Sequence, residues 1–173
     1  MIEKQNQIGI YYGSQTGNAE LLASDAGVLA TAYGFENKVA GLDEISVEEF
    51  SQNKFLIICT STWGDGEQPD NAQEMFDMIS EVSDAALSGT HFAVLGIGDT
   101  AFEMFCESAR EWDILLEQKG GLRTFERAEC DIDYEDDADE WLVSTLELMK
   151  TEQEKEDWTW VKTKKHRIRQ LKK

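Results

Sequence analysis

Residues 7–33 read QIGIYYGSQTGNAELLASDAGVLATAY and decide the fold. The run from Gln7 to Tyr12 is short and apolar and stops at Gly13, which is typical of a buried strand. After a short polar loop, apolar residues recur at helical spacing up to Tyr33. The stretch therefore predicts a strand, a tight loop and a helix, which is the opening unit of a parallel α/β sheet.

The same alternation of strand and helix continues along the chain. The runs KFLIICT and HFAVLGI have the composition of strands that are buried inside a parallel sheet. Glycines at 89 and 120–121 are expected to end helices. We expect an α/β doubly wound sandwich with a five-stranded parallel sheet and helices on both faces. The further strands are expected at 35–40, 54–60, 91–97 and 122–128, and the further helices at 71–82, 105–119 and 136–150.

The charge of the chain is divided unevenly. The 173 residues, enough for one domain, carry a formal net charge of −19. Residues 1–161 hold nine basic and 35 acidic side chains, a net charge of −26, whereas residues 162–173 hold seven basic side chains and no acid. The strong negative charge of residues 1–161 argues against general nucleic-acid binding, because the nucleic-acid backbone is also negatively charged. We expect one domain at 1–150 and a C-terminal extension with a basic end at 151–173.

The sequence also indicates where in the cell the protein is located and whether its cysteines are reduced. No apolar run approaches the length of about 18 residues that a membrane span needs, and the N-terminus lacks the zones of a signal peptide. The three cysteines, Cys59, Cys106 and Cys130, are odd in number, widely spaced and without a CxxC pair. This spacing suggests neither a disulfide framework nor a zinc site. We expect a cytoplasmic protein with reduced thiols and no membrane span.

The loop after the first strand has the composition of a phosphate-binding loop. Residues 14–19, SQTGNA, enter the helix with small and hydroxyl-bearing side chains and without lysine or arginine. Such a loop can bind a phosphate through backbone N–H groups, the positive end of the helix dipole and the hydroxyls of Ser14 and Thr16. It is neither a Walker loop nor a GxGxxG loop. The alternative is an ordinary Ser/Thr helix cap.

Two further loops follow the third and fourth expected strands. Residues 60–67, TSTWGDGE, place Trp63 among glycines, and residues 96–106, GIGDTAFEMFC, place Phe102 in a corresponding polar loop. Ligands of open parallel sheets lie beyond the carboxyl ends of the strands, where these loops meet. The two aromatic residues can therefore bracket a flat ring whose tail ends at the first loop. For either residue taken alone, local packing is the alternative.

Taken together, these three loops resemble those of the flavodoxin family, most closely the FMN domain of sulfite reductase flavoprotein and related diflavin reductases. The resemblance spans about residues 7–150 and rests on SQTGNA (14–19), STWGDGE (61–67) and GDTAFEMFC (98–106). It implies a sheet of order 2-1-3-4-5 and non-covalent FMN. At position 63, however, the tryptophan is similar to the residue of free-standing flavodoxins rather than to that of the diflavin reductases. Phe102 stands where the family commonly has tyrosine, and the long insertion of some flavodoxins in the fifth strand is absent.

The resemblance also implies a set of cofactor-binding residues. Residues 14–19 are expected around the phosphate, and Trp63 and Phe102 on the two faces of the flavin ring. We expect no catalytic residue and no metal ligand. The complete expected set is Ser14, Gln15, Thr16, Gly17, Asn18, Ala19, Ser61, Thr62, Trp63, Gly64, Gly96, Gly98, Asp99, Thr100, Phe102, Glu103, Phe105 and Cys106.

The expected function is that of a monomeric electron carrier, which is not itself an enzyme. It passes single electrons at low potential between a reductase and redox acceptor proteins. The acidic body steers basic surfaces of partners, such as a flavin-dependent NADPH reductase and an acceptor enzyme, toward the flavin. We expect no reductase module after residue 150, so hydride chemistry is expected to belong to a partner.

Two other functions remain open: that of an FMN-binding subunit of a multicomponent reductase and that of a cofactor-free docking protein. A phosphoacceptor receiver needs an acidic pair after the first strand and an aspartate after the third, but Tyr12-Gly13 and Cys59-Thr60 stand there. A nicotinamide dehydrogenase lacks its GxGxxG loop, and a low-molecular-weight phosphatase lacks its Cys-x5-Arg loop.

Overall fold

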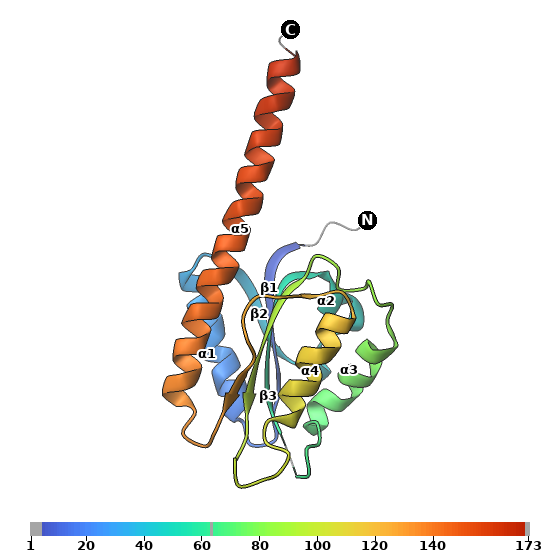
Figure 1. Cartoon of the computed structure of the whole chain (residues 1–173), viewed down its shortest axis with the longest axis vertical. Coiled ribbons are helices and arrows are strands. Elements are labelled where there is room, and N and C mark those ends of the chain that lie inside the picture. Colours follow the sequence, from blue (N-terminus) through green and yellow to red (C-terminus); the bar gives the residue numbers. More distant parts are fainter. Residues whose placement is uncertain (1–4, 63, 172–173) are drawn as a thin grey trace.

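The computed structural model describes residues 5–62 and 64–171 as a parallel sheet between two layers of helices, with one long helix extending beyond them (Figure 1). The strands are β1 (Gln5–Gly13), β2 (Glu36–Gly41), β3 (Asn53–Ser61), β4 (His91–Ile97), β5 (Leu122–Arg123) and β6 (Ala128–Cys130). The helices are α1 (Asn18–Ala32), α2 (Val47–Gln52), α3 (Asp70–Glu81), α4 (Glu107–Gln118) and α5 (Glu135–Leu171), with a 3₁₀ turn η1 (Leu42–Glu44).

The strand order β2-β1-β3-β4-β5, all parallel, confirms the expected fold class. The expectation of one continuous fifth strand at 122–128 was wrong. β5 pairs with the start of β4 and β6 with its end, and residues 124–127 separate them. A charged cluster accompanies the interruption. Arg123 Nε and Arg127 Nη1, on either side of it, both bind the carboxylate of Asp113 on α4, at 2.9 and 2.8 Å.

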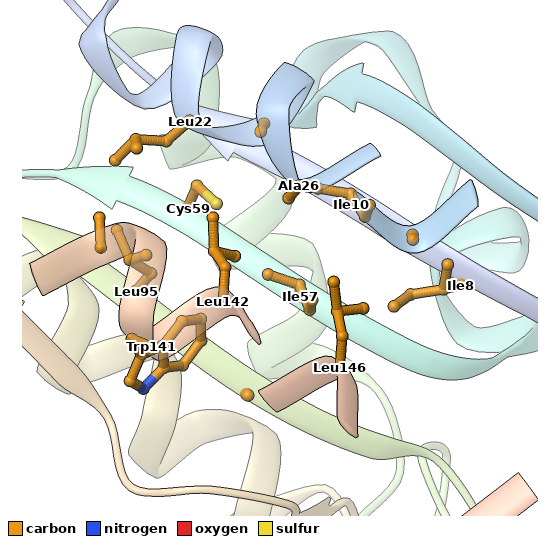
Figure 2. Close-up of a cluster of buried hydrophobic side chains, with 14 of the residues drawn as sticks. Ile8, Ile10, Leu22, Ala26, Ile57, Cys59, Leu95, Trp141, Leu142 and Leu146 are labelled. Carbon is orange, nitrogen blue, oxygen red and sulfur yellow. The ribbon is translucent and has the colours of Figure 1, made fainter. Parts of the chain in front are cut away.

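Successive strand residues point to opposite faces of the sheet, which separates the apolar side chains into two cores. On one face, Ile8, Ile10 and Ile57 pack with apolar residues of α1 and α5 (Figure 2). On the other face, Leu56 and Ile58 pack with residues of α2, α3 and α4. Each Å² of apolar surface that is removed from water in these two cores stabilises the fold by about 25 cal/mol. The carboxyl ends of β1, β3 and β4 are thereby fixed side by side.

The last helix is longer than the expected 136–150 and runs unbroken from Glu135 to Leu171. No glycine or proline occurs after Gly121, so nothing in the sequence stops the helix. The expected boundary at residue 150 falls inside it. None of the helices in the described ranges is apolar over a length that could cross a membrane.

Candidate functional site

A cavity of about 560 Å³ opens at the carboxyl ends of β1, β3 and β4. This volume lies within the range of about 300–1,000 Å³ that is usual for cofactor sites. Four loops contribute to it, because each follows a strand that ends at this edge of the sheet. Its described lining residues are Gln15, Thr16, Asn18, Ser61, Thr62, Gly64, Ile97, Gly98, Asp99, Phe102, Met104, Phe105, Cys106, Ile132 and Tyr134.

The first loop is held in a shape that presents the start of α1 to the cavity. Gly17 is the N-cap of α1 with φ +93°, a left-handed conformation that glycine adopts most readily. Its N–H donates to Ser14 Oγ at 2.9 Å. The N–H of Ser14 in turn donates to Asn71 Oδ1 on α3, also at 2.9 Å. The first-turn N–H groups of a helix have no intrahelical acceptor, so this loop offers donors to an anion.

A buried polar network joins the second loop to the start of α4. Thr62 Oγ1 accepts the N–H of Ser108 at 3.0 Å, and the hydroxyls of Thr60 and Ser108 lie 2.7 Å apart. The Ser108 hydroxyl also donates to Gln68 Oε1 at 2.7 Å, and the indole N–H of Trp112 donates to the same oxygen at 3.0 Å. Each of these hydrogen bonds joins residues far apart in sequence. The network therefore fixes the second loop against the helix that follows the third loop.

The third loop is tied to the segment after β6. Thr100 donates to Asp131 from both its N–H, at 3.1 Å, and its hydroxyl, at 2.6 Å. These hydrogen bonds and that from the N–H of Ile132 hold the pKa of Asp131 below its ordinary value. Asp131 is therefore a carboxylate at neutral pH. This contact holds the segment after β6 at the cavity. Ile132 and Tyr134 line the cavity together with residues of the first loop, although the two segments are far apart in sequence.

The side chains of the third loop differ in exposure. Phe102 is 59% exposed and Met104 is 42% exposed, although both are large and apolar. Cys106, in contrast, is buried with φ +53°, and burial raises the pKa of its thiol to about 12. The thiol is neutral at physiological pH. Exposed apolar side chains beside a cavity are a frequent mark of a ligand site, and here they offer contact area for a flat ring.

The structure brings together eleven of the expected site residues as cavity lining: Gln15, Thr16, Asn18, Ser61, Thr62, Gly64, Gly98, Asp99, Phe102, Phe105 and Cys106. Trp63 lies outside the described residues. The other expected residues have different positions. Ser14 and Thr100 make the loop contacts above, Gly17 caps α1, and Glu103 is exposed. Ala19 is buried in the core of the α1–α5 face, and Gly96 lies against the Cβ of Ala109.

Sequence reasoning missed several residues of this region. Ile97, Met104, Ile132 and Tyr134 also line the cavity. Two of these, Ile97 and Met104, lie within the quoted third loop and could have been included. Ile132 and Tyr134 follow the fifth-strand region, whose carboxyl end also faces this edge of the sheet. Asn71 was missed because it contacts the first loop across 57 positions of sequence.

Comparison with known proteins bears on the same region. The family model described as Flavodoxin matches residues 10–142. The sulfite reductase [NADPH] flavoprotein alpha-component of Bacillus subtilis (strain 168) is 37% identical over 140 residues, which are 81% of this chain and 23% of that protein. The protein of the same name from Shewanella sp. (strain MR-7) is 34% identical over 143 residues, 83% of this chain and 24% of that protein. The chain thus spans about a quarter of the length of these curated relatives.

Solved structures of flavodoxins are similar over nearly their whole length. A flavodoxin of Streptococcus pneumonia TIGR4 has a TM-score of 0.77 at 25% identity, covering 84% of this chain and 99% of that one. Oxidised Flavodoxin 2 from Bacillus cereus has a TM-score of 0.72 at 28% identity, with coverages of 84% and 99%.

Proposed function

The chain belongs to the flavodoxin family of FMN-binding electron-transfer proteins, and we propose that it holds FMN in the cavity described above and passes single electrons at low potential between a reductase and an acceptor protein. The observation that carries the proposal is the cavity itself. It combines a glycine-capped helix start at one end with exposed apolar side chains at the other.

The residues present fit FMN. Residues 14–18 would hold the phosphate through N–H groups and hydroxyls, since the described lining residues include no lysine or arginine. Phe102, Met104 and Tyr134 would cover the ring and exclude water from it. Bound FMN supplies the one-electron redox chemistry, and the protein supplies binding, orientation and electrostatics. A neutral Cys106 adds no charge to the site.

The acidic body favours a low potential in this proposal. Reduction adds negative charge to the site, and one carboxylate about 10 Å away opposes that charge by about 1.7 kcal/mol at an effective dielectric constant near 20. Asp99 lines the cavity, and the segment 131–140 beside it holds seven acidic residues. The same charges would attract basic-surfaced partners, such as a flavin-dependent NADPH reductase and an acceptor enzyme.

Several finer points belong to the same proposal. The protein is a carrier without catalysis of its own, a monomer, and cytoplasmic. Residues 1–150 form the FMN-binding domain, since every described cavity residue lies between 15 and 134. Residues 151–173 are an extension whose removal leaves FMN affinity unchanged. That removal is expected to cost stability, because Gln153 is buried and Glu156 pairs with Lys54.

A second candidate function is an FMN-binding subunit of a multicomponent reductase. The curated relatives favour it, since they are named as a component of sulfite reductase and this chain matches only part of them. The two functions differ in the lifetime of the partner complex. A subunit co-purifies with its partner at physiological salt, whereas a carrier releases it.

Absorbance spectroscopy tests the proposal and separates it from a cofactor-free docking protein. The purified chain should be yellow, or should become so with added FMN, at one FMN per chain. Riboflavin, which lacks the phosphate, should bind more weakly. A colourless protein that rejects added FMN would refute the proposal.

A further inference from the structure

The last part of α5 extends beyond the body of the protein. Gln153 is buried, and Glu156 pairs with Lys54 and lies 3.9 Å from His91 Nε2, so α5 is still attached to the starts of β3 and β4 at this point. From residue 157 onward the described side chains are exposed, except for half-buried Val161. Figure 1 shows this segment projecting away from the sheet and the other helices. We call residues 157–171 the projecting segment.

The projecting segment and the cavity lie at opposite ends of the sheet. α5 begins next to Tyr134, which lines the cavity at the carboxyl ends of the strands. It leaves the body near His91, the first residue of β4 and therefore at the amino end. A surface that binds the segment would therefore leave the cavity uncovered.

The charge of the projecting segment is opposite to that of the body. After Asp157 it contains Lys162, Lys164, Lys165, Arg167 and Arg169 and no acidic residue, whereas residues 1–161 have a net charge of −26. Since α5 is one continuous helix, the segment cannot fold back onto its own body without breaking. Its charge complement is therefore an anionic surface outside this molecule.

Exposed aromatic side chains indicate what kind of surface that is. Trp158 and Trp160 are 62% and 59% exposed, and Leu171 is 87% exposed. Trp160, Lys164 and Leu171 share one side of the helix, being four and eleven positions apart, and Lys164 Nζ lies 4.4 Å from the centroid of the Trp160 ring. Indole rings favour the interface between a bilayer and water, and clusters of basic side chains bind surfaces of anionic lipid.

We propose that the projecting segment binds the surface of a bilayer containing anionic lipid and holds the protein there while the cavity stays uncovered. Repulsion between the acidic body and the surface is screened by physiological salt beyond the Debye length of about 8 Å. Each basic side chain near such a surface strengthens binding by about fivefold.

Vesicle flotation with the full chain tests the proposal. Vesicles of phosphatidylcholine with about one third phosphatidylglycerol should bind the protein at about 0.1 M salt and shift its tryptophan fluorescence to shorter wavelength, whereas pure phosphatidylcholine should do neither. Lys162→Ala combined with Lys165→Ala should weaken binding by about 25-fold. The matched control, Lys38→Ala combined with Lys155→Ala, removes the same charge outside the basic cluster and should bind as the wild type does.

Three outcomes would overturn the proposal. One is equal binding to vesicles with and without anionic lipid, which includes no binding to either. Another is unchanged binding after loss of Lys162 and Lys165. The third is that a DNA duplex or polyglutamate binds the chain more tightly than the vesicles do, which would assign the segment to nucleic acid or an acidic protein. The proposal is independent of FMN, whose absorbance should be the same in all variants.

Discussion

Gly17→Ala tests the phosphate loop directly. The substitution adds a Cβ to the N-cap of α1 at φ +93°, where it meets no other atom within 4 Å. Its effect on the ligand-free protein is therefore backbone strain alone, about 1–2 kcal/mol for an L-residue in the left-handed region. If the loop relaxes to avoid the strain, the first-turn N–H groups of α1 move away from the phosphate. We expect FMN to bind about 5- to 30-fold more weakly, which corresponds to the same 1–2 kcal/mol.

Gly34→Ala is the matched control for this substitution. Gly34 follows the opposite end of α1 with φ +85°, and a Cβ there approaches only Lys150 Nζ, at 3.4 Å. Both variants should lose a similar free energy of unfolding in urea, since the strain is similar. In fluorescence-quenching titrations, only Gly17→Ala should lose FMN affinity, and it should bind riboflavin within about twofold of the wild type. Equal losses of FMN and riboflavin, or an equal loss of FMN in Gly34→Ala, would refute the assignment of the loop.

Three further substitutions test other parts of the account. Phe102→Ala should weaken FMN about tenfold while the free energy of unfolding changes by less than about 0.5 kcal/mol, because the ring is exposed; Leu21→Ala, equally exposed but away from the cavity, should alter neither. Ser108→Ala removes two buried hydrogen bonds, to Thr60 and Gln68, and should cost about 1–3 kcal/mol in urea unfolding, and Ser80→Ala, at an exposed helix position, should cost far less. Burial lowers the pKa of His91 in the folded protein, so as the pH falls this histidine takes up a proton in the unfolded chain before it does so in the folded one. Stability is therefore lost as the pH falls through about 6.5. His91→Gln should thus lose less stability than the wild type between about pH 7.5 and 5.5, and an equal loss would exclude this histidine as the cause.

The order of the sheet and the place of the cavity could be predicted from the sequence because both depend on local patterns. Apolar runs and helical spacing identified β1, β3, β4 and their helices within a few residues. One short helix, α2, was missed although a signal was present. Ser46 caps it by accepting the N–H of Glu49, and Ser-x-x-Glu is the sequence pattern of a capping box.

The remaining features depend on contacts that no local pattern records. The break between β5 and β6 is accompanied by two arginines that share Asp113 on a different element. The shape of the first loop depends on Asn71, and that of the third on Asp131. Each of these polar side chains is unremarkable in its own stretch of sequence. Their roles become apparent only once the fold has brought distant segments together.

An anaerobic reductive titration of the FMN-loaded chain, followed by absorbance at controlled potential, shows whether this protein carries single electrons. We expect two separate one-electron reductions, with the second at a lower potential than that of free FMN, because the acidic surroundings oppose the added negative charge. Raising the salt concentration should bring the second potential closer to that of free FMN, since salt screens those charges. A single two-electron reduction at the potential of free FMN would contradict the claim that this protein carries single electrons.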